Sequence, residues 1–301
     1  MHLPLRTFAS PLRPLRENLN DKSMLKSILK AFLIIIILII LAYCALVYIL
    51  GGYGPKDPVA LPLKSQDSLL LFAHRGVTEK FPENSREAIE QARKLKFKGL
   101  EVDIRKSADN QFILFHDENA QRLIGVDTGI YYLTTAQIKT YNLLFEGDTS
   151  KSAVLTLPEM LDENRNDFII YLDMKLKGIH AVDELVHLIW TYDLSRKVIL
   201  ANVNPLVIFY VEYNYPAINT ALEGFDSGKE WMWRLMPKNL KPDFLSGFAS
   251  KVDEKHVEWL KKKDLLGSRI VYGVDSTNYQ AMVDLGVKKI IVDSWKKLQV
   301  Q

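Results

Sequence analysis

The sequence contains a single cysteine, Cys44, so the chain cannot form an internal disulfide bond and must fold by packing alone. It also lacks internal repeats, and its only low-complexity stretch is one apolar run. These absences exclude a collagen, a mucin, a disordered tail and a disulfide-stapled miniprotein. The 301 residues, 48% of them hydrophobic, are enough for one large domain or two small ones with a substantial core.

A basic surplus is missing from all of the sequence except its N-terminal end. Residues 1–30 carry six Lys or Arg against two acidic residues, and residues 31–50 carry no charge. The rest of the chain has 33 basic and 34 acidic residues. Nucleic-acid-binding surfaces need an excess of positive charge, so we expect no nucleic-acid partner. The sequence implies no protein partner either.

The longest apolar run, at 31–50, reads AFLIIIILIILAYCALVYIL and contains no charge, Pro or Gly. A helix of this length rises about 30 Å, the thickness of the hydrocarbon core of a bilayer. The alternative is a cleaved signal peptide, whose apolar region is usually about 7–15 residues long. Because the run is longer than that, we predict a single uncleaved transmembrane anchor at 31–50.

The charges on either side of this run predict its orientation. Six Lys or Arg precede it, whereas only Lys56 and Lys64 follow within fifteen residues. Positive flanks usually stay in the cytoplasm, so we expect residues 1–30 to form a basic cytoplasmic tail. Residues 51–68 are rich in Gly and Pro and are interpreted as a linker. The main domain, at 69–301, is then expected on the outer side of the membrane.

In the main domain, short apolar or β-branched runs alternate with amphipathic stretches at helix spacing. This alternation favours a parallel α/β fold, and the number of strands favours a TIM (β/α)8 barrel. Nine strands are predicted for eight positions, so one of them is wrong or lies outside. The connection 106–111 is too short for a helical crossover, which predicts an irregular start to the barrel. The predicted strands are 69–73, 99–104, 112–116, 168–173, 197–201, 217–222, 243–248, 269–274 and 289–293.

Polar residues gather at the ends of the first four predicted strands. They are His74 and Arg75 after the first, Glu101 and Asp103 within the second, His116 and Asp117 after the third, and Asp173 and Lys175 after the fourth. The two carboxylates of the second strand share one face because strand side chains alternate. In a barrel the C-terminal strand ends meet at one mouth, so we expect these side chains in a single pocket.

This set of side chains suits chemistry at a phosphodiester. Three carboxylates favour a hard divalent cation, Mg²⁺ or Ca²⁺. Arg75 offers a fork of donors that matches a phosphate, and two histidines can accept one proton and donate another. Each piece alone has a structural interpretation: a solvated carboxylate face or a structural histidine. Asn84 is interpreted as the N-cap of a helix at 84–96, and Asp117 as a hydrogen-bond partner rather than a ligand.

Together, HRG at 74–76, PEN at 82–84, E-x-D at 101–103 and HD at 116–117 resemble the signature of the glycerophosphodiester phosphodiesterase family. D-x-K at 173–175 extends the resemblance, which becomes thin after residue 200. It implies a TIM barrel of the phosphatidylinositol phosphodiesterase superfamily. The implied activity is metal-dependent hydrolysis of a glycerophosphodiester to an alcohol and sn-glycerol 3-phosphate.

The resemblance also implies roles for individual residues. His74 and His116 match the acid–base pair, and Arg75 and Lys175 match the groups near the phosphate. Glu101, Asp103 and Asp173 match the three ligands of the divalent cation. The family usually has Glu at the third ligand position, so Asp173, one methylene shorter, can coordinate through water or change the preferred cation.

Two other functions stay open. One is a lysophospholipase D-like activity on membrane lysophospholipids, because a membrane anchor would hold the barrel at a bilayer. The other is an inactive, membrane-tethered binding barrel. Residues 225–242 contain Trp231 and Trp233 beside basic residues, a composition typical of a membrane interface. This segment either packs onto the barrel or faces lipid or substrate.

The predicted orientation can be tested by proteolysis. Protease added outside intact cells or spheroplasts should digest the domain at 69–301 and spare an epitope tag at the N-terminus. Digestion of the tag with protection of the domain would reverse the orientation. A mature chain that begins after residue 50 would show that the apolar run is a signal peptide.

Overall fold

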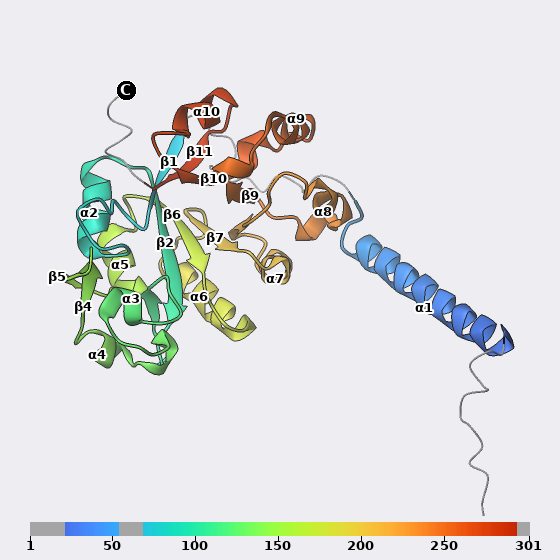
Figure 1. The fold of residues 1–301 in the computed structure, drawn as a ribbon, viewed down its shortest axis with the longest axis horizontal. Coiled ribbons are helices and arrows are strands. Elements are labelled where there is room, and N and C mark those ends of the chain that lie inside the picture. The colour runs from blue at the N-terminus through green and yellow to red at the C-terminus, as the bar shows by residue number, and fades with distance from the viewer. Residues whose placement is uncertain (1–21, 54–68, 294–301) are drawn as a thin grey trace, which may run out of the picture. The chain divides into compact units, whose positions relative to one another are not determined.

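A computed structural model describes residues 22–53 and 69–293, which divide into two compact units (Figure 1). The first unit is Met1–Gly52 and the second is Tyr53–Gln301. Most of the predicted tail at 1–30 and of the predicted linker at 51–68 lies outside the described residues. The domain boundaries expected from the sequence therefore stay predictions.

The described part of the first unit is one helix, α1 (Lys22–Ile49). It begins before the apolar run at 31–50 because the preceding residues Met24–Lys30 contain no Pro or Gly that would stop a helix. Residues Met24–Ile49 form a segment long and apolar enough to cross a membrane. A signal sequence near an N-terminus can pass the same test of length and hydropathy.

The second unit is a closed barrel of eight parallel strands, as the alternating sequence pattern predicts. The first strand pairs with both the second and the last, which closes the ring. The fold is a TIM barrel. In order around the ring, its strands are β1 (Leu70–His74), β2 (Gly99–Lys106), β6 (Ile169–Met174), β7 (Val198–Asn202), β8 (Asn219–Leu222), β9 (Phe244–Phe248), β10 (Arg269–Val274) and β11 (Lys289–Val292).

The ninth predicted strand lies outside the ring. β3 (Phe112–Leu114) runs antiparallel to the end of β2, with Leu114 opposite Ile104. The chain reverses through a turn at 107–111 because that connection is too short for a crossover. The irregular start is confirmed. The expectation that His116 ends a barrel strand is wrong, because that residue follows the returning arm of a hairpin.

An insertion follows this hairpin before the chain re-enters the barrel at β6. It contains α3 (Gln121–Ile124), α4 (Thr135–Ile138) and a second hairpin of β4 (Asn142–Phe145) and β5 (Asp148–Ala153). These elements lie together beside the barrel in Figure 1 and bury an apolar cluster of their own around Ile113, Phe115 and Leu123. The insertion is where the fold departs from a regular (β/α)8 pattern.

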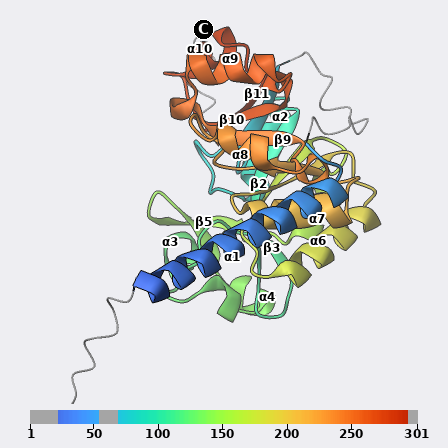
Figure 2. The same cartoon turned by 90° about the vertical axis from the view of Figure 1, so that its right-hand side faces the viewer.

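Helices cover the outside of the barrel, and the main core lies between them and the strands. In α6 the buried residues, such as Val182, Leu185 and Ile189, follow helical spacing and face the sheet. α6 and α7 lie next to each other (Figure 2), joined by contacts such as Trp190 with Tyr215. The helices of the barrel are α2 (Arg86–Lys94), α5 (Leu157–Asn164), α6 (Ile179–Thr191), α7 (Pro205–Asn214), α8 (Glu230–Leu235), α9 (Glu254–Lys262) and α10 (Tyr279–Asp284).

The inside of the barrel is packed below its mouth. Phe72 and Tyr171 are fully buried and meet edge to face, with ring centroids 6.1 Å apart. The residue beside this ring must be glycine, because a Cβ at Gly99 would come within 2.4 Å of the Phe72 ring. This packed floor confines water and ligands to the C-terminal end of the strands.

Candidate active site

Strand register brings the predicted site residues together at the mouth of the barrel. His74 pairs with Glu101 across β1 and β2, and Asp103 pairs with Asp173 across β2 and β6. They surround a cavity of about 360 Å³. Its lining includes six of the seven predicted residues: His74, Arg75, Glu101, His116, Asp173 and Lys175. The seventh, Asp103, is buried and forms ion pairs with Arg75 and Lys175.

The three carboxylates form a tight, nearly dry cluster. Glu101, Asp103 and Asp173 each offer one oxygen, and these atoms lie within 4.8 Å of one another. Burial, together with the charge of Asp103, raises the pKa of Glu101 to about 8 against the opposing charge of His74. Within the described residues, Asp103 Oδ1 is buried and accepts no hydrogen bond. Concentrated negative charge with a free acceptor fits a hard divalent cation.

Asn84 holds Asp103 in place. It is 2% exposed and has a left-handed φ of 57°. Its Nδ2 donates to Asp103 Oδ2 (3.0 Å), and its Oδ1 accepts from the backbone N–H of Asp103 (3.3 Å). The prediction of Asn84 as a helix cap is wrong, because Ser85 caps α2 by accepting from the N–H of Ala88. The N-cap of α2 lies one residue after the predicted position, so the sequence pattern assigned Asn84 to the cap and did not indicate its bonds to Asp103.

Arg75 is shared between the carboxylate cluster and the surface. Its Nε lies 3.0 Å from Asp103 Oδ2, and its Nη1 lies 3.0 Å from Glu83 Oε1. Arg122 bonds the same Glu83 and also Asp117, so an ionic chain runs from Arg75 toward His116. Neither Glu83 nor Arg122 stood out in the sequence, although Glu83 lies within the PEN motif at 82–84.

Each predicted catalytic histidine has a carboxylate on Nδ1. His74 Nδ1 lies 2.6 Å from Asp293 Oδ1, and His116 Nδ1 lies 2.7 Å from Asp117 Oδ1. Burial lowers the pKa of His74, but Glu101 and Asp293 outweigh it, so the pKa is raised. A carboxylate on Nδ1 leaves Nε2 of each ring for other partners, and His74 Nε2 lies 3.7 Å from Glu101 Oε2. The predicted partnership of Asp117 is confirmed, whereas Asp293 was missed because it ends the last strand with no motif around it.

Lys175 and Glu223 are two further charged side chains that line the first cavity. Lys175 Nζ lies 2.5 Å from Asp173 Oδ2 and 3.7 Å from Asp103 Oδ1. Glu223 follows β8 and accepts a hydrogen bond from the Tyr171 hydroxyl (2.9 Å). Burial, and then the charge of Asp173, raises the pKa of Glu223 to about 8. Glu223 was also missed by sequence reasoning, and its only signal is its place directly after a predicted strand.

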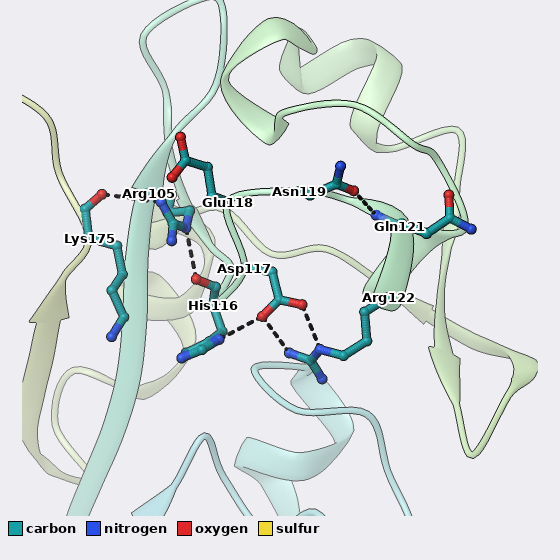
Figure 3. Close-up of a pocket in the computed structure, with 8 residues that line it drawn as sticks. All are labelled: Arg105, His116, Asp117, Glu118, Asn119, Gln121, Arg122 and Lys175. Carbon is teal, nitrogen blue, oxygen red and sulfur yellow. Dashed lines mark hydrogen bonds and ion pairs between the residues drawn. The ribbon is translucent and has the colours of Figure 1, made fainter.

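A second cavity, of about 510 Å³, shares His116 and Lys175 with the first (Figure 3). Arg105 frames it by donating from Nε to the carbonyl of His116 (2.8 Å). The remaining lining residues are all polar or charged: Asp117, Glu118, Asn119, Gln121 and Arg122. The site therefore has two compartments that meet at a histidine and a lysine.

A TIM barrel whose mouth gathers two histidines, three carboxylates, an arginine and a lysine has the groups that hydrolysis of a phosphodiester requires. The model of the glycerophosphoryl diester phosphodiesterase family matches residues 74–297, and the chain belongs to that family. The match begins at His74 and includes every residue predicted to form the site.

Curated relatives cover the barrel to different extents. A glycerophosphodiester phosphodiesterase of Caldanaerobacter subterraneus is 24% identical over 233 residues, which cover 74% of this chain and 93% of that protein. Glycerophosphodiester phosphodiesterase 1 of Bos taurus is 30% identical over 166 residues, 53% of this chain and 50% of the bovine protein. The chain thus spans most of the bacterial relative and half of the mammalian one.

Solved structures share the fold. The glycerophosphodiester phosphodiesterase of Agrobacterium tumefaciens superposes with a TM-score of 0.66 at 18% identity, over 77% of this chain and 100% of that chain. A phosphodiesterase of Oleispira antarctica, solved with the product sn-glycerol-3-phosphate, has a TM-score of 0.66 at 20% identity, over 80% and 96% of the two chains.

Replacement of Asn84 tests how firmly Asp103 is held. Asn84→Ala removes the two hydrogen bonds that Asn84 makes with the buried Asp103, so it should lower the free energy of unfolding by about 1–3 kcal/mol and reduce phosphodiesterase turnover. Thermal unfolding and steady-state kinetics measure the two effects. As a control, Ser85→Ala removes only the cap of α2 and should cost about 1 kcal/mol without lowering kcat. Wild-type stability and kcat in Asn84→Ala would contradict this role.

Proposed function

We propose that the protein hydrolyses a glycerophosphodiester to an alcohol and sn-glycerol 3-phosphate with the help of a divalent cation. The observation that carries this proposal is the meeting of two histidines, each bonded to a carboxylate, with three buried carboxylates and Arg75. The product complex of the Oleispira antarctica phosphodiesterase supports the choice of substrate class.

The two histidines move the protons of the reaction. One Nε2 accepts a proton from the attacking water as the new P–O bond forms. The other Nε2 donates a proton to the alcohol oxygen as its bond to phosphorus breaks. Asp293 and Asp117, each on an Nδ1, hold the rings in the tautomer that this exchange needs and stabilise the protonated form. Arg75 and Lys175 bind the phosphate oxygens.

Glu101, Asp103 and Asp173 are the side chains that would hold the cation, Mg²⁺ or Ca²⁺. When bound, such a cation stabilises negative charge that develops on the phosphoryl oxygens. Arg75 and Lys175 offset part of the charge of the cluster, but they lie at its edge and also face the substrate cavity. The family's usual Glu at the third position is Asp173 here, and its oxygen still lies within 4.8 Å of the other two.

A lysophospholipase D-like activity is the second candidate. It is favoured by the apolar side of the first cavity, where Val203 and Phe248 line the wall. We further propose that α1 anchors the barrel in a membrane, with the N-terminus cytoplasmic and the barrel on the outer side. An inactive binding barrel is disfavoured, because all seven proposed site residues are present and meet at one mouth.

Loss of either histidine should abolish most of the activity. We expect His74→Ala and His116→Ala each to lower kcat by at least about 10²-fold, the usual contribution of a general acid or base. Turnover of glycerophosphocholine and of bis(p-nitrophenyl) phosphate by the purified full chain provides the measurement. His187→Ala, an exposed histidine on α6, is the matched control and should keep wild-type kcat. A folded His74 or His116 variant with near-wild-type turnover would remove that residue from the pair.

Removal of divalent cations should also abolish activity. EDTA should eliminate turnover, and Mg²⁺ or Ca²⁺ should restore it, because the cluster offers only oxygen ligands. The same cations should raise the melting temperature of the apo protein, since they bind the folded state alone. Glu101→Gln should weaken both effects, and Asp173→Glu tests the third position through its change in cation affinity. Full activity in excess chelator would refute the metal-dependent mechanism.

A further inference from the structure

Exposed apolar side chains lie along one arc of the mouth of the barrel. Six large ones, each 48–70% exposed, lie at or after the ends of the four consecutive strands β6, β7, β8 and β9. We call them the apolar rim: Ile179, Val203, Leu206, Trp231, Leu235 and Phe248. The loop after β10 and the segment after β3 instead present polar residues, such as Thr277, Glu118 and Arg122. Because β6, β7, β8 and β9 are neighbours in the ring, the loops that follow them lie side by side along one arc of the mouth.

The packing of helix α8 holds the side chains of Trp231 and Leu235 at the surface. Trp231, Arg234 and Leu235 are spaced i, i+3, i+4 and share one exposed face. On the other side, Trp233 is buried in an apolar cluster and lies under Lys241, whose Nζ is 4.6 Å from the ring centroid. The first residue of the helix, Glu230, bonds the buried His256 (2.7 Å). Of the two tryptophans singled out in the sequence, one is core and the other is held outward.

We propose that the apolar rim docks on the surface of a lipid bilayer. Tryptophan and leucine beside an arginine form the composition that lies at the boundary of lipid headgroups and acyl chains. Arg234 has no ion-pair partner among the described residues, so its charge is available to lipid phosphates. The same chain carries α1, which is long and apolar enough to cross a membrane, and this favours lipid over another protein as the occupant.

The length of the chain permits such docking. The barrel begins at Leu70, at the end of β1 opposite the mouth. The fifteen residues 54–68 can span at most about 50 Å. β1 itself rises only about 17 Å. Enough chain is therefore present for the rim to reach a surface in which α1 is inserted.

Docking has a consequence for the substrate that rests on the proposed function. Val203 and Phe248 belong both to the apolar rim and to the lining of the first cavity. A diester with an acyl chain could pass from the bilayer along this wall with its chain shielded from water. Its polar head would then meet the charged and polar side chains that line the second cavity, on the other side of His116 and Lys175.

A matched pair of labels tests the docking directly. Leu206 and Tyr213 lie near opposite ends of α7 and are 70% and 65% exposed, but only Leu206 is at the mouth. Each is replaced by Cys in a full-length Cys44→Ser chain, labelled with an environment-sensitive fluorophore, and reconstituted in vesicles of phosphatidylcholine and phosphatidylglycerol. Adding doxyl-labelled lipid should quench the label at 206 and leave the label at 213 unchanged. Equal quenching, quenching at 213 alone, or a blue shift at 206 without quenching would overturn the proposal, the last because it would show a protein on the rim.

A second variant separates docking from catalysis. Trp231→Gln/Leu235→Gln should remove the quenching at 206 and lower turnover of a vesicle-borne lysophospholipid by at least about tenfold. Its kcat/KM on water-soluble glycerophosphocholine should stay at the wild-type value, because neither residue lines the cavity. Equal losses on both substrates, or no loss on either, would count against the rim. If the wild-type chain fails on all diesters, the proposed function fails, while the label pair still decides docking.

Discussion

Negative charge is hardest to place in water-poor surroundings, and this barrel places three carboxylates there within 4.8 Å of one another. The rest of the site follows from that constraint. Asn84 donates to Asp103, while Arg75 and Lys175 form ion pairs with the cluster. These contacts orient the carboxylates but leave one buried oxygen without a hydrogen bond. A cluster oriented in this way and incompletely neutralised is suited to capture a cation.

The two histidines reach the mouth from different elements, one from a barrel strand and the other from the irregular hairpin. His74 comes from the end of the first barrel strand, as a TIM barrel requires. His116 comes from a hairpin that leaves the end of β2 and returns, so that the backbone N–H of Phe115 donates to the carbonyl of Asp103. The hairpin brings a second histidine to the same mouth and also supplies Arg105 and Asp117, which fix its position. The insertion behind it forms the polar cavity.

Charged groups and exposed apolar groups lie on different sides of the mouth. The charged groups line the cavity beside the insertion, and the exposed apolar groups lie on and next to α6, α7 and α8. Exposed apolar area is costly unless something covers it, since each buried Å² is worth about 25 cal/mol. This cost is the physical basis for proposing that the apolar rim meets lipid.

Strand and helix periodicity and short ordered motifs are local properties, so the sequence alone was enough to predict the barrel, its irregular start and the seven residues that the fold brings to one mouth. It did not identify Asn84, Glu223 or Asp293. Each of them acts through a residue that is distant in the sequence and close only in the folded barrel: Asp103, Tyr171 and His74 respectively. A single sequence does not reveal which distant residues are in contact. The same holds for the tryptophans: composition selected Trp231 and Trp233 together, and only packing against α9 and the barrel placed one inside and one outside. Tertiary contacts decided these cases because burial is a property of the whole fold.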